Sequence, residues 1–501
     1  AIANVNGLWT SPVPYVLDKD LEMNAKGITL KAFDQFRLKS CIDFKPRDSE
    51  KYYISVQKLG GCFSFIGRVI ANGQDLSIGK NCDSISTVEH EFLHCDNITT
   101  TTQGVPYDYL SVMHYNKNTF SNGNGSTIGT IDPKYQDVIG QRLEMSHSDV
   151  LELNGLYKCS KYSTIAFKMH CSFSNGSMCE MTRCSQSGRG WEMETTVQGG
   201  PESDHTSLPN GCGEDAGYFM HASTASGKEG DSAWLETHMM STNREHHIQC
   251  LQFYYYHSGN PLDHLNIWIR EFQDERDLKG NLRLMGQLTG PPTSFWQLHH
   301  VTLNATKHFQ VEFEVRKGAG NSSGGFSIDD INLSELECPH VTLQLDEFKD
   351  RLNKSSFRTI ISSPRQYSTG GYAYAVGVIM YKTYFGVFVQ LLSGKYDDQL
   401  QWPCLQRQVT FKLLDQNSNI QLQMSKQISV TSDLATFNNG NYVWDDPAKV
   451  GTSYVDENNE TVFAGPLIGR NNFSDLEQLK TRDFLKGGSA TFVFSFQGRQ
   501  K

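Results

Sequence analysis

The sequence predicts a chain of three domains, an α+β domain followed by two antiparallel β-sandwiches. Three observations predict this fold class. The chain has 501 residues, and a domain usually holds roughly 100–200 residues. Helix and strand patterns are mixed up to about residue 160, whereas short alternating strand patterns dominate from about residue 165 onward. A hydrophobic content of 38% lets each domain bury a core of its own.

The first domain, residues 1–160, is predicted to combine helices with strands. One helical face between 24 and 40 collects Ile28, Phe33 and Phe36, which is the spacing of an amphipathic helix. Ser146 is a suitable N-cap for the last helix of the domain. The patterns place helices at 24–40, 84–95 and 146–157 and a strand at 52–56.

Two β-rich domains are expected at 165–338 and 339–501. In both, alternating runs are separated by clusters of Gly, Pro and Asn, which is typical of sandwiches. The expected strands include 251–256, 265–270, 309–315, 372–378, 384–391, 409–414 and 490–496. The most apolar stretch, 375–392, is broken by Lys382 and two glycines, so we expect two strands there and no membrane span in this chain.

Charge and cysteine content restrict the function. With 45 basic and 55 acidic residues the net charge is −10, which excludes a nucleic-acid-binding footprint. The 12 cysteines are dispersed and form no CxxC pair, so disulfides in an oxidising compartment are expected. Nine sequons support an extracellular chain, secreted or a cell-surface ectodomain, and we expect a leader to have been removed or omitted before Ala1. The expected glycosylation sites are Asn97, Asn124, Asn175, Asn304, Asn321, Asn332, Asn353, Asn459 and Asn472.

The second predicted helix contains the motif HEFLH, with His90, Glu91 and His94. The i, i+4 spacing places both imidazoles on one helical face, where they can bind one zinc ion. Glu91 then lies beside the metal-bound water and can act as general base. A helix with two ordinary histidines is the alternative interpretation.

A second motif, SVMHY at 111–115, resembles the Met-turn of metzincin proteases. The alternative interpretation is an ordinary amphipathic strand or turn. The similarity extends further. Segments that resemble the astacin-type domain of meprins are AI at 1–2, YVLDK at 15–19, NAKG at 24–27, CIDFKP at 41–46 and IGQR at 139–142. Segments that resemble a MAM domain are GYFM at 217–220, CLQF at 250–253 and SIDD at 327–330, and those that resemble a MATH (TRAF-like) domain are DDQLQWPC at 397–404 and NYVW at 441–444.

The chain therefore resembles the meprin family over nearly its whole length, with the β-type subunits as the nearer match. The resemblance implies a metzincin-type zinc metalloendopeptidase domain at 1–160, a MAM domain at 165–338 and a MATH domain at 339–501. It implies one Zn²⁺ per chain on His90 and His94, Glu91 as base, Tyr115 as oxyanion helper and Met113 beneath the metal.

The resemblance also implies bridges and partners. The implied disulfides are Cys41–Cys159, Cys62–Cys82, Cys171–Cys179 and Cys250–Cys338. Cys212 corresponds to the position that links meprin subunits, which implies a disulfide-linked homo- or heterodimer; a free or intramolecularly paired thiol is the alternative. Protein and peptide substrates are implied, and Arg142 could favour acidic side chains in them or serve as a surface salt-bridge partner. Full-length family members carry a membrane anchor after the MATH domain.

The chain departs from the family at the metal. The astacin motif continues as HExxHxxGxxHE, but this chain has Asn97, Thr100 and Thr101 where the glycine, the third histidine and the glutamate belong. Only 18 residues separate His94 from Met113, and none of them is a histidine. A catalytic zinc site uses three protein ligands. A skipped exon, a splice form or a protease that has lost activity would each leave this pattern.

Two functions remain open from the sequence. The first is a meprin-type zinc metalloendopeptidase. The second is a catalytically impaired or inactive glycoprotein that acts through association or adhesion by its MAM and MATH domains.

Overall fold

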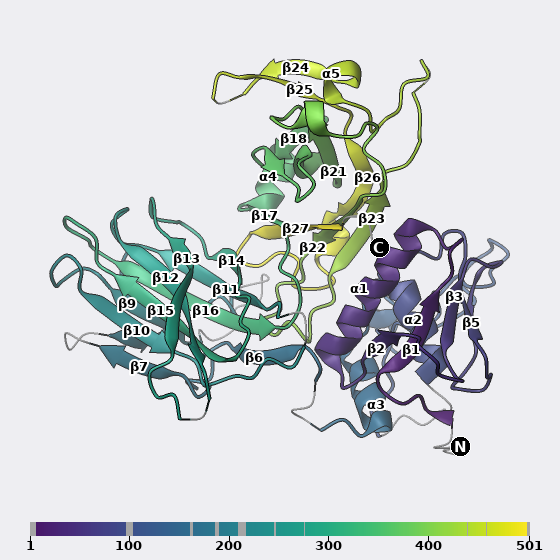
Figure 1. Cartoon of the computed structure of the whole chain (residues 1–501), viewed down its shortest axis with the longest axis horizontal. Helices are drawn as coiled ribbons and strands as arrows, with labels where there is room; N and C mark the ends of the chain where they lie inside the picture. The colour runs from purple at the N-terminus through teal and green to yellow at the C-terminus, as the bar shows by residue number, and fades with distance from the viewer. Residues whose placement is uncertain are drawn as a thin grey trace.

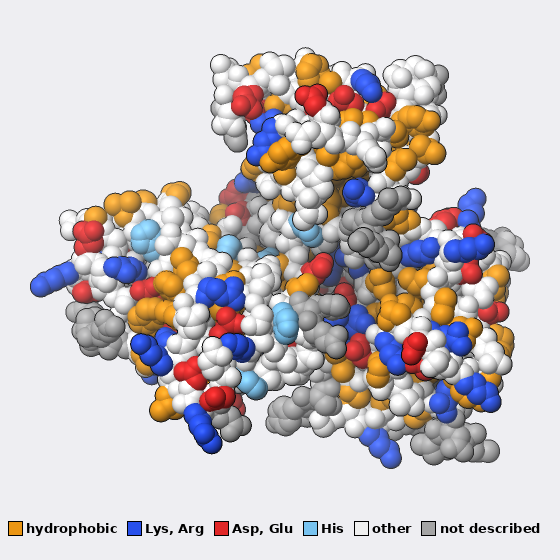
Figure 2. Space-filling view, in the orientation of Figure 1, with side chains coloured by type: hydrophobic (Ala, Val, Ile, Leu, Met, Phe, Trp, Pro, Cys, Tyr) orange, Lys and Arg blue, Asp and Glu red, His pale blue; other side chains and the backbone are white. Residues whose placement is uncertain are grey.

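The computed structural model describes most of the chain. The described ranges are 7–96, 104–160, 164–185, 190–208, 217–244, 247–274, 276–437, 439–456 and 458–497, without the side chains of Asp96 and Ser185. Two predicted sites, Asn97 and Cys212, lie outside these ranges. Figure 1 shows three lobes that meet at a central junction, so the predicted α+β domain followed by two antiparallel sandwiches is confirmed. Acidic and basic side chains are interspersed across the face of the molecule shown in Figure 2.

The N-terminal domain is a mixed sheet with helices. The sheet order is β2-β1-β3-β5-β4, in which β4 is antiparallel to β5 and the other pairs are parallel. The strands are β1 (Val13–Leu17), β2 (Phe44–Pro46), β3 (Ile54–Gln57), β4 (Cys62–Ser64) and β5 (Gln74–Ile78). The helices are α1 (Met23–Lys39), α2 (Ile85–Asp96), the 3₁₀ turn η2 (Pro133–Tyr135) and α3 (His147–Tyr157). All three predicted helices form, and Ser146 caps α3 in a capping box with Asp149.

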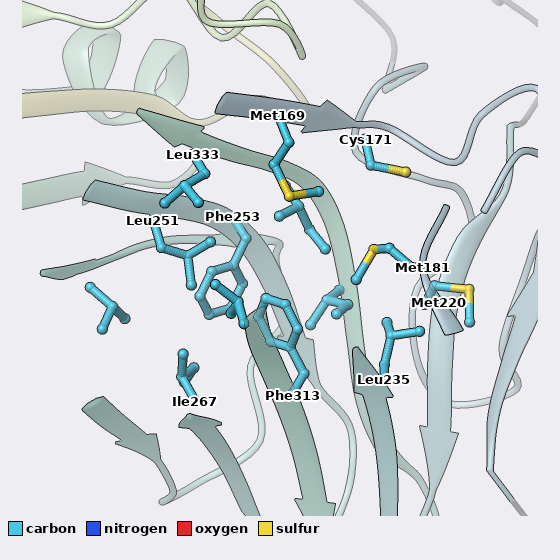
Figure 3. Close-up of a cluster of buried hydrophobic side chains, with 14 of the residues drawn as sticks. Met169, Cys171, Met181, Met220, Leu235, Leu251, Phe253, Ile267, Phe313 and Leu333 are labelled. Atoms are coloured by element: carbon cyan, nitrogen blue, oxygen red, sulfur yellow. The ribbon is translucent and has the colours of Figure 1, made fainter. Parts of the chain in front are cut away.

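The middle domain packs two antiparallel sheets face to face. One has the order β13-β12-β15-β10-β7, and the other has β14-β11-β16-β9-β8 with β6 also paired to β16. The strands are β6 (Phe167–Cys171), β7 (Thr182–Ser185), β8 (Trp191–Glu194), β9 (Phe219–Ser223), β10 (Ser232–Glu236), β11 (Cys250–His257), β12 (His264–Phe272), β13 (Asn281–Leu288), β14 (Gln297–Thr302), β15 (His308–Arg316) and β16 (Gly325–Ser334). Figure 3 shows Leu251, Phe253, Ile267 and Phe313 pointing into the core of this domain, where all four are fully buried.

The C-terminal domain is also an antiparallel sandwich. One sheet has the order β17-β27-β22-β23, and the other has β18-β20-β21-β25-β24 with β19 and β26 attached. The strands are β17 (Val341–Leu345), β18 (Thr359–Ser362), β19 (Gln366–Tyr367), β20 (Ala373–Met380), β21 (Tyr384–Leu392), β22 (Gln408–Leu413), β23 (Lys426–Thr431), β24 (Thr452–Val455), β25 (Thr461–Ala464), β26 (Ile468–Asp475) and β27 (Ala490–Gln497). The short helices are α4 (Phe348–Lys354), η3 (Asp397–Gln399), α5 (Pro447–Val450) and α6 (Leu476–Leu479).

The apolar stretch 375–392 forms most of β20, the connection at 381–383 and all of β21, and the two strands pair as neighbours in a sheet. Among the described residues, no helix is both long enough and apolar enough to cross a bilayer.

The first and last domains are in direct contact, because α1 lies alongside β23 and β22 (Figure 1). Gln408 donates from Nε2 to the backbone carbonyl of Asn24 at 3.0 Å, and Gln421 donates to the carbonyl of Leu38 at 2.9 Å. These bonds hold α1 near both of its ends. The C-terminal domain therefore packs against the helix that supports the core of the N-terminal domain.

Four disulfides link the cysteine pairs that the family resemblance implies. They join Cys41 to Cys159, Cys62 to Cys82, Cys171 to Cys179 and Cys250 to Cys338. Cys184, which is exposed, and Cys404, which is buried, are outside these bonds.

One predicted glycosylation site is wrong. The side chain of Asn332 is 1% exposed, and its Nδ2 donates to the carbonyls of Asp330 and Ser418. This fold leaves no room for a glycan at that amide. The exposed sequon asparagines are Asn124, Asn175, Asn304, Asn321, Asn353, Asn459 and Asn472.

Candidate functional site

The site is built on α2, whose buried face holds it in the domain core. Ser84 precedes the helix, and its Oγ accepts a hydrogen bond from the backbone N–H of Thr87 at 3.2 Å. Phe92 is fully buried and contacts the rings of Phe33 and Phe36 of α1 edge-on. Packing on this face fixes the rotation of α2, so the opposite side of the helix presents the predicted motif.

His90 and His94 meet on one face of α2, as predicted. Their Nε2 atoms are 3.1 Å apart, and their rings are perpendicular. His90 Nδ1 donates to the backbone carbonyl of Val112 at 3.0 Å, which leaves the Nε2 lone pair of the neutral ring facing His94. Burial lowers the pKa of His90, and burial together with His90 lowers the pKa of His94 to about 4. Both imidazoles are thus neutral at pH 7, the form that binds metal ions.

Glu91 lies beside this pair. Its side chain is 5% exposed, and among the described residues its Oε2 accepts no hydrogen bond. Burial raises the pKa of Glu91 to about 7, while the positive charge of Arg142 opposes that shift. A carboxylate with a pKa near neutrality is suited to general-base chemistry.

The segment 111–115 forms a turn against α2. Asp149 of α3 anchors it, because its carboxylate accepts from Ser111 Oγ at 2.5 Å and from the backbone N–H of Val112 at 2.8 Å. Met113 packs against the core of the domain. The neighbouring Tyr115 is 54% exposed, and its ring contacts Phe120.

Two neighbouring side chains of types that can bind metal ions, His114 and Cys95, make contacts elsewhere. His114 Nε2 accepts from the hydroxyl of Tyr107 at 2.7 Å, and its Nδ1 donates to the carbonyl of Tyr115. Cys95 is buried, with its Sγ 2.7 Å from Ser64 Oγ of β4.

The described residues do not complete a three-ligand zinc site. The histidine pair has suitable spacing for one side of a metal ion, since a Zn–N bond is about 2.0–2.1 Å long. However, no third His, Cys, Asp or Glu in the described part of the chain joins it to form a metal-binding group. The segment 97–103 contains none of these residue types in its sequence. The pair alone supplies two of the three protein ligands that catalytic zinc sites use.

Two site residues were not predicted. Asp149 anchors the turn, and the backbone carbonyl of Val112 orients His90. The capping pattern Ser146-x-x-Asp149 was a sequence signal for the first, because it marked a buried acidic residue at the start of α3. No side-chain pattern identifies a backbone acceptor. Arg142 is exposed and donates from Nη1 to the carbonyls of Val112, His114 and Gln141.

Similarity to known families covers nearly the whole chain. The astacin family of peptidases matches residues 1–98 and 95–158, the MAM domain family (meprin/A5/mu) matches 171–339, and the MATH domain family matches 340–496. The astacin match consists of two segments that meet at 95–98, which is where the sequence departs from the astacin motif.

Two relatives align with nearly the whole chain. Meprin A subunit beta from Homo sapiens is 44% identical over 526 aligned positions, which cover 98% of this chain and 74% of that protein. That alignment is 25 positions longer than the 501 residues of this chain, so the relative contains residues that this chain lacks. Meprin A subunit alpha from Mus musculus is 34% identical, covering 99% of this chain and 71% of that protein.

One solved structure is similar to about a third of the chain. High choriolytic enzyme 1, a hatching-enzyme zinc protease from Oryzias latipes, is 25% identical over 32% of this chain and 98% of its own length, with a TM-score of 0.29. The two meprin subunits are each more than 30% identical to this chain, over nearly all of this chain and more than two thirds of their own length. The chain therefore belongs to the meprin family of zinc metalloendopeptidases, built from an astacin protease domain, a MAM domain and a MATH domain.

Proposed function

We propose that this chain hydrolyses peptide bonds in proteins and peptides with a zinc ion held by His90 and His94. The observation that carries the proposal is the pair of Nε2 atoms 3.1 Å apart, with His90 oriented by the carbonyl of Val112. The two Nε2 atoms face each other, and a metal ion bound by both would need His94 in the tautomer that carries its proton on Nδ1.

Glu91 is the proposed general base. Its pKa of about 7 allows it to take a proton from water and return it to the leaving amine near neutral pH. The exposed hydroxyl of Tyr115 is the proposed donor to the developing oxyanion. The guanidinium of Arg142 lies near Glu91 and gives this part of the site a positive charge that would favour acidic substrate side chains.

The zinc of this chain is proposed to be loosely bound. Two protein ligands hold a metal ion less tightly than three, so we expect the ion to exchange readily and activity to depend on free zinc. Titrating zinc into the metal-depleted chain while following cleavage of a quenched fluorescent peptide tests this. Wild type should become active as zinc is added, and Glu91→Ala should remain at least about 100-fold less active. Glu22→Ala, on the exposed surface of the same domain, is the matched control and should behave like wild type.

A second function is favoured by one observation. No third metal-binding side chain joins His90 and His94 among the described residues. A chain with this site could act as a catalytically inactive glycoprotein whose MAM and MATH domains mediate association or adhesion. In that case added zinc produces no cleavage that depends on Glu91.

The chain is further proposed to act outside the cell as a disulfide-linked dimer. Four disulfides and seven exposed sequon asparagines support an extracellular, secreted or cell-surface location. Cys212 is the proposed intersubunit cysteine. Non-reducing electrophoresis should show a dimer that Cys212→Ser converts to a monomer, whereas a monomeric wild-type band contradicts the proposal.

A further inference from the structure

Two side chains converge on one backbone oxygen beside the histidine pair. The carbonyl oxygen of Val112 accepts from His90 Nδ1 at 3.0 Å and from Arg142 Nη1 at 3.2 Å. The same Nη1 lies 3.3 Å from the carbonyl of His114 and 2.8 Å from that of Gln141. Arg142 therefore ties the turn at 111–115 to the segment that precedes α3.

The turn is held on both sides. Asp149 binds the backbone N–H of Val112 and the hydroxyl of Ser111, while Arg142 binds the carbonyl side of the same segment. The two peptide groups that flank Val112 are therefore each restrained, the first at its N–H and the second at its carbonyl, and they have little freedom to rotate. The acceptor that orients His90 is consequently fixed before any metal ion binds.

We propose that Arg142 is a positioning residue for the metal ligand His90. By fixing the carbonyl of Val112, it keeps His90 Nδ1 protonated and Nε2 directed at His94. This inference rests on the proposed function, in which the histidine pair holds zinc. This positioning role of Arg142 differs from the recognition of acidic substrate side chains, because it acts through the backbone oxygen of Val112 and requires no substrate.

The residue type fits this role. The planar guanidinium holds Nη1 in one orientation, so its two N–H groups can be shared among the three neighbouring carbonyls. A lysine keeps the charge but offers a single flexible ammonium group. Arg142→Lys should therefore recover only part of the restraint, and Arg142→Ala should remove it.

The first test uses the zinc-free chain. Hydrogen–deuterium exchange of peptides covering 111–116 should be faster in Arg142→Ala than in wild type, with Arg142→Lys intermediate. Lys80→Ala, which removes an exposed positive charge in the same domain, is the matched control and should exchange like wild type. Unchanged exchange in Arg142→Ala overturns the inference. Arg142 is exposed, and a thermal melt verifies that each variant is folded.

The second test measures zinc affinity by competition with a chromophoric chelator. Groups that orient metal ligands typically contribute 10–100-fold in affinity, so Arg142→Ala should bind zinc about 10-fold or more weakly than wild type. Faster exchange with zinc affinity unchanged overturns the inference, because Arg142 would then hold the turn without positioning His90. If wild type itself binds no zinc, the proposed function and this inference both fail, whereas zinc binding by wild type with unchanged affinity in Arg142→Ala overturns this inference alone.

Discussion

Gly27 of α1 faces the side chain of Gln408 so closely that a Cβ atom at position 27 would lie 1.8 Å from Gln408 Oε1. Gln408 belongs to β22 of the MATH domain and donates from Nε2 to the carbonyl and the side chain of Asn24. Asn24 in turn donates to Asp83, just before the helix that carries the histidine pair. A glycine near the start of α1 thus allows two residues from different domains, 381 positions apart in the chain, to touch.

Gly27→Ala should disturb this contact. Alanine favours a helix by about 1 kcal/mol over glycine, but here its methyl group displaces Gln408 and breaks two hydrogen bonds that contribute about 0.5–1.5 kcal/mol each. We expect no gain in the free energy of unfolding, measured by urea denaturation. The control is the same change in a Gln408→Ala background, where the methyl group has room and should stabilise the chain. Equal stabilisation in both backgrounds would show that the domains do not pack closely here.

A buried ion pair of the N-terminal domain lies at the same contact with the MATH domain. Lys39 and Glu144 have side chains 1% and 2% exposed, their charged groups are 3.2 Å apart, and Lys39 Nζ donates to the carbonyl of Gln423 of the MATH domain. Lys39→Met leaves Glu144 buried without its main partner, which should cost about 3–5 kcal/mol. Urea denaturation measures the loss, and adding Glu144→Gln should recover part of it.

The control for the buried pair is an exposed one. Lys480 and Glu477 are 2.7 Å apart but 66% and 81% exposed, so Lys480→Met should cost no more than about 1 kcal/mol. The account of the interface is wrong if Lys39→Met and Lys480→Met destabilise the chain equally.

Acid should weaken the contact between the MAM and MATH domains through His300. Its Nε2 donates to Gln252, and its Nδ1 accepts from the hydroxyl of Thr342 in β17. Burial, with smaller contributions from His299 and Lys412, lowers the pKa of His300 to about 3. Between pH 3 and its ordinary pKa of about 6.5, the unfolded chain binds a proton that the folded chain does not. Stability should therefore be complete above pH 6.5 and fall as the pH is lowered.

The effect of His300 is at most about 1.4 kcal/mol per pH unit. The free energy of unfolding of His300→Gln should show a shallower decline between pH 6.5 and 4.5 than that of wild type. His247→Asn replaces an exposed histidine and should leave the slope unchanged. Parallel curves for wild type and His300→Gln would contradict the assignment.

Asp149 should be critical for the turn beside the histidines. It accepts from Ser111 and from the N–H of Val112, and it completes the capping box of α3. Asp149→Ala leaves a buried N–H unsatisfied and removes a cap, which together should cost about 2–4 kcal/mol. Thermal unfolding measures the loss. Asp132→Ala, at the exposed turn η2, should cost much less, and equal losses would contradict the anchoring role.

Periodicity and motif spacing predict the local features of this chain well. The buried positions Ile28, Phe33 and Phe36 and the facing pair His90 and His94 lie where the helical period places them. Such features depend on neighbours within one or two helical turns, so they can be read from the sequence.

Features that depend on distant partners could not be predicted. Asn332 matches a sequon, yet it is buried because β16 lies in the centre of a sheet and Ser418 of the next domain accepts its amide hydrogen. His300 would suit a polar surface position, but the MATH domain covers it. Arginine is most often a surface residue, so the sequence alone does not single out Arg142. Its contacts are to backbone carbonyls about 30 residues away in the sequence.

The most direct test of the central claim is zinc binding measured together with peptide cleavage on the purified chain at rising free zinc. The account predicts bound zinc that is lost in His90→Ala and His94→Ala, and zinc-dependent cleavage that is lost in Glu91→Ala. Less than about 0.3 zinc per chain at saturating zinc, with cleavage no different between wild type and Glu91→Ala, would contradict it and favour the inactive glycoprotein.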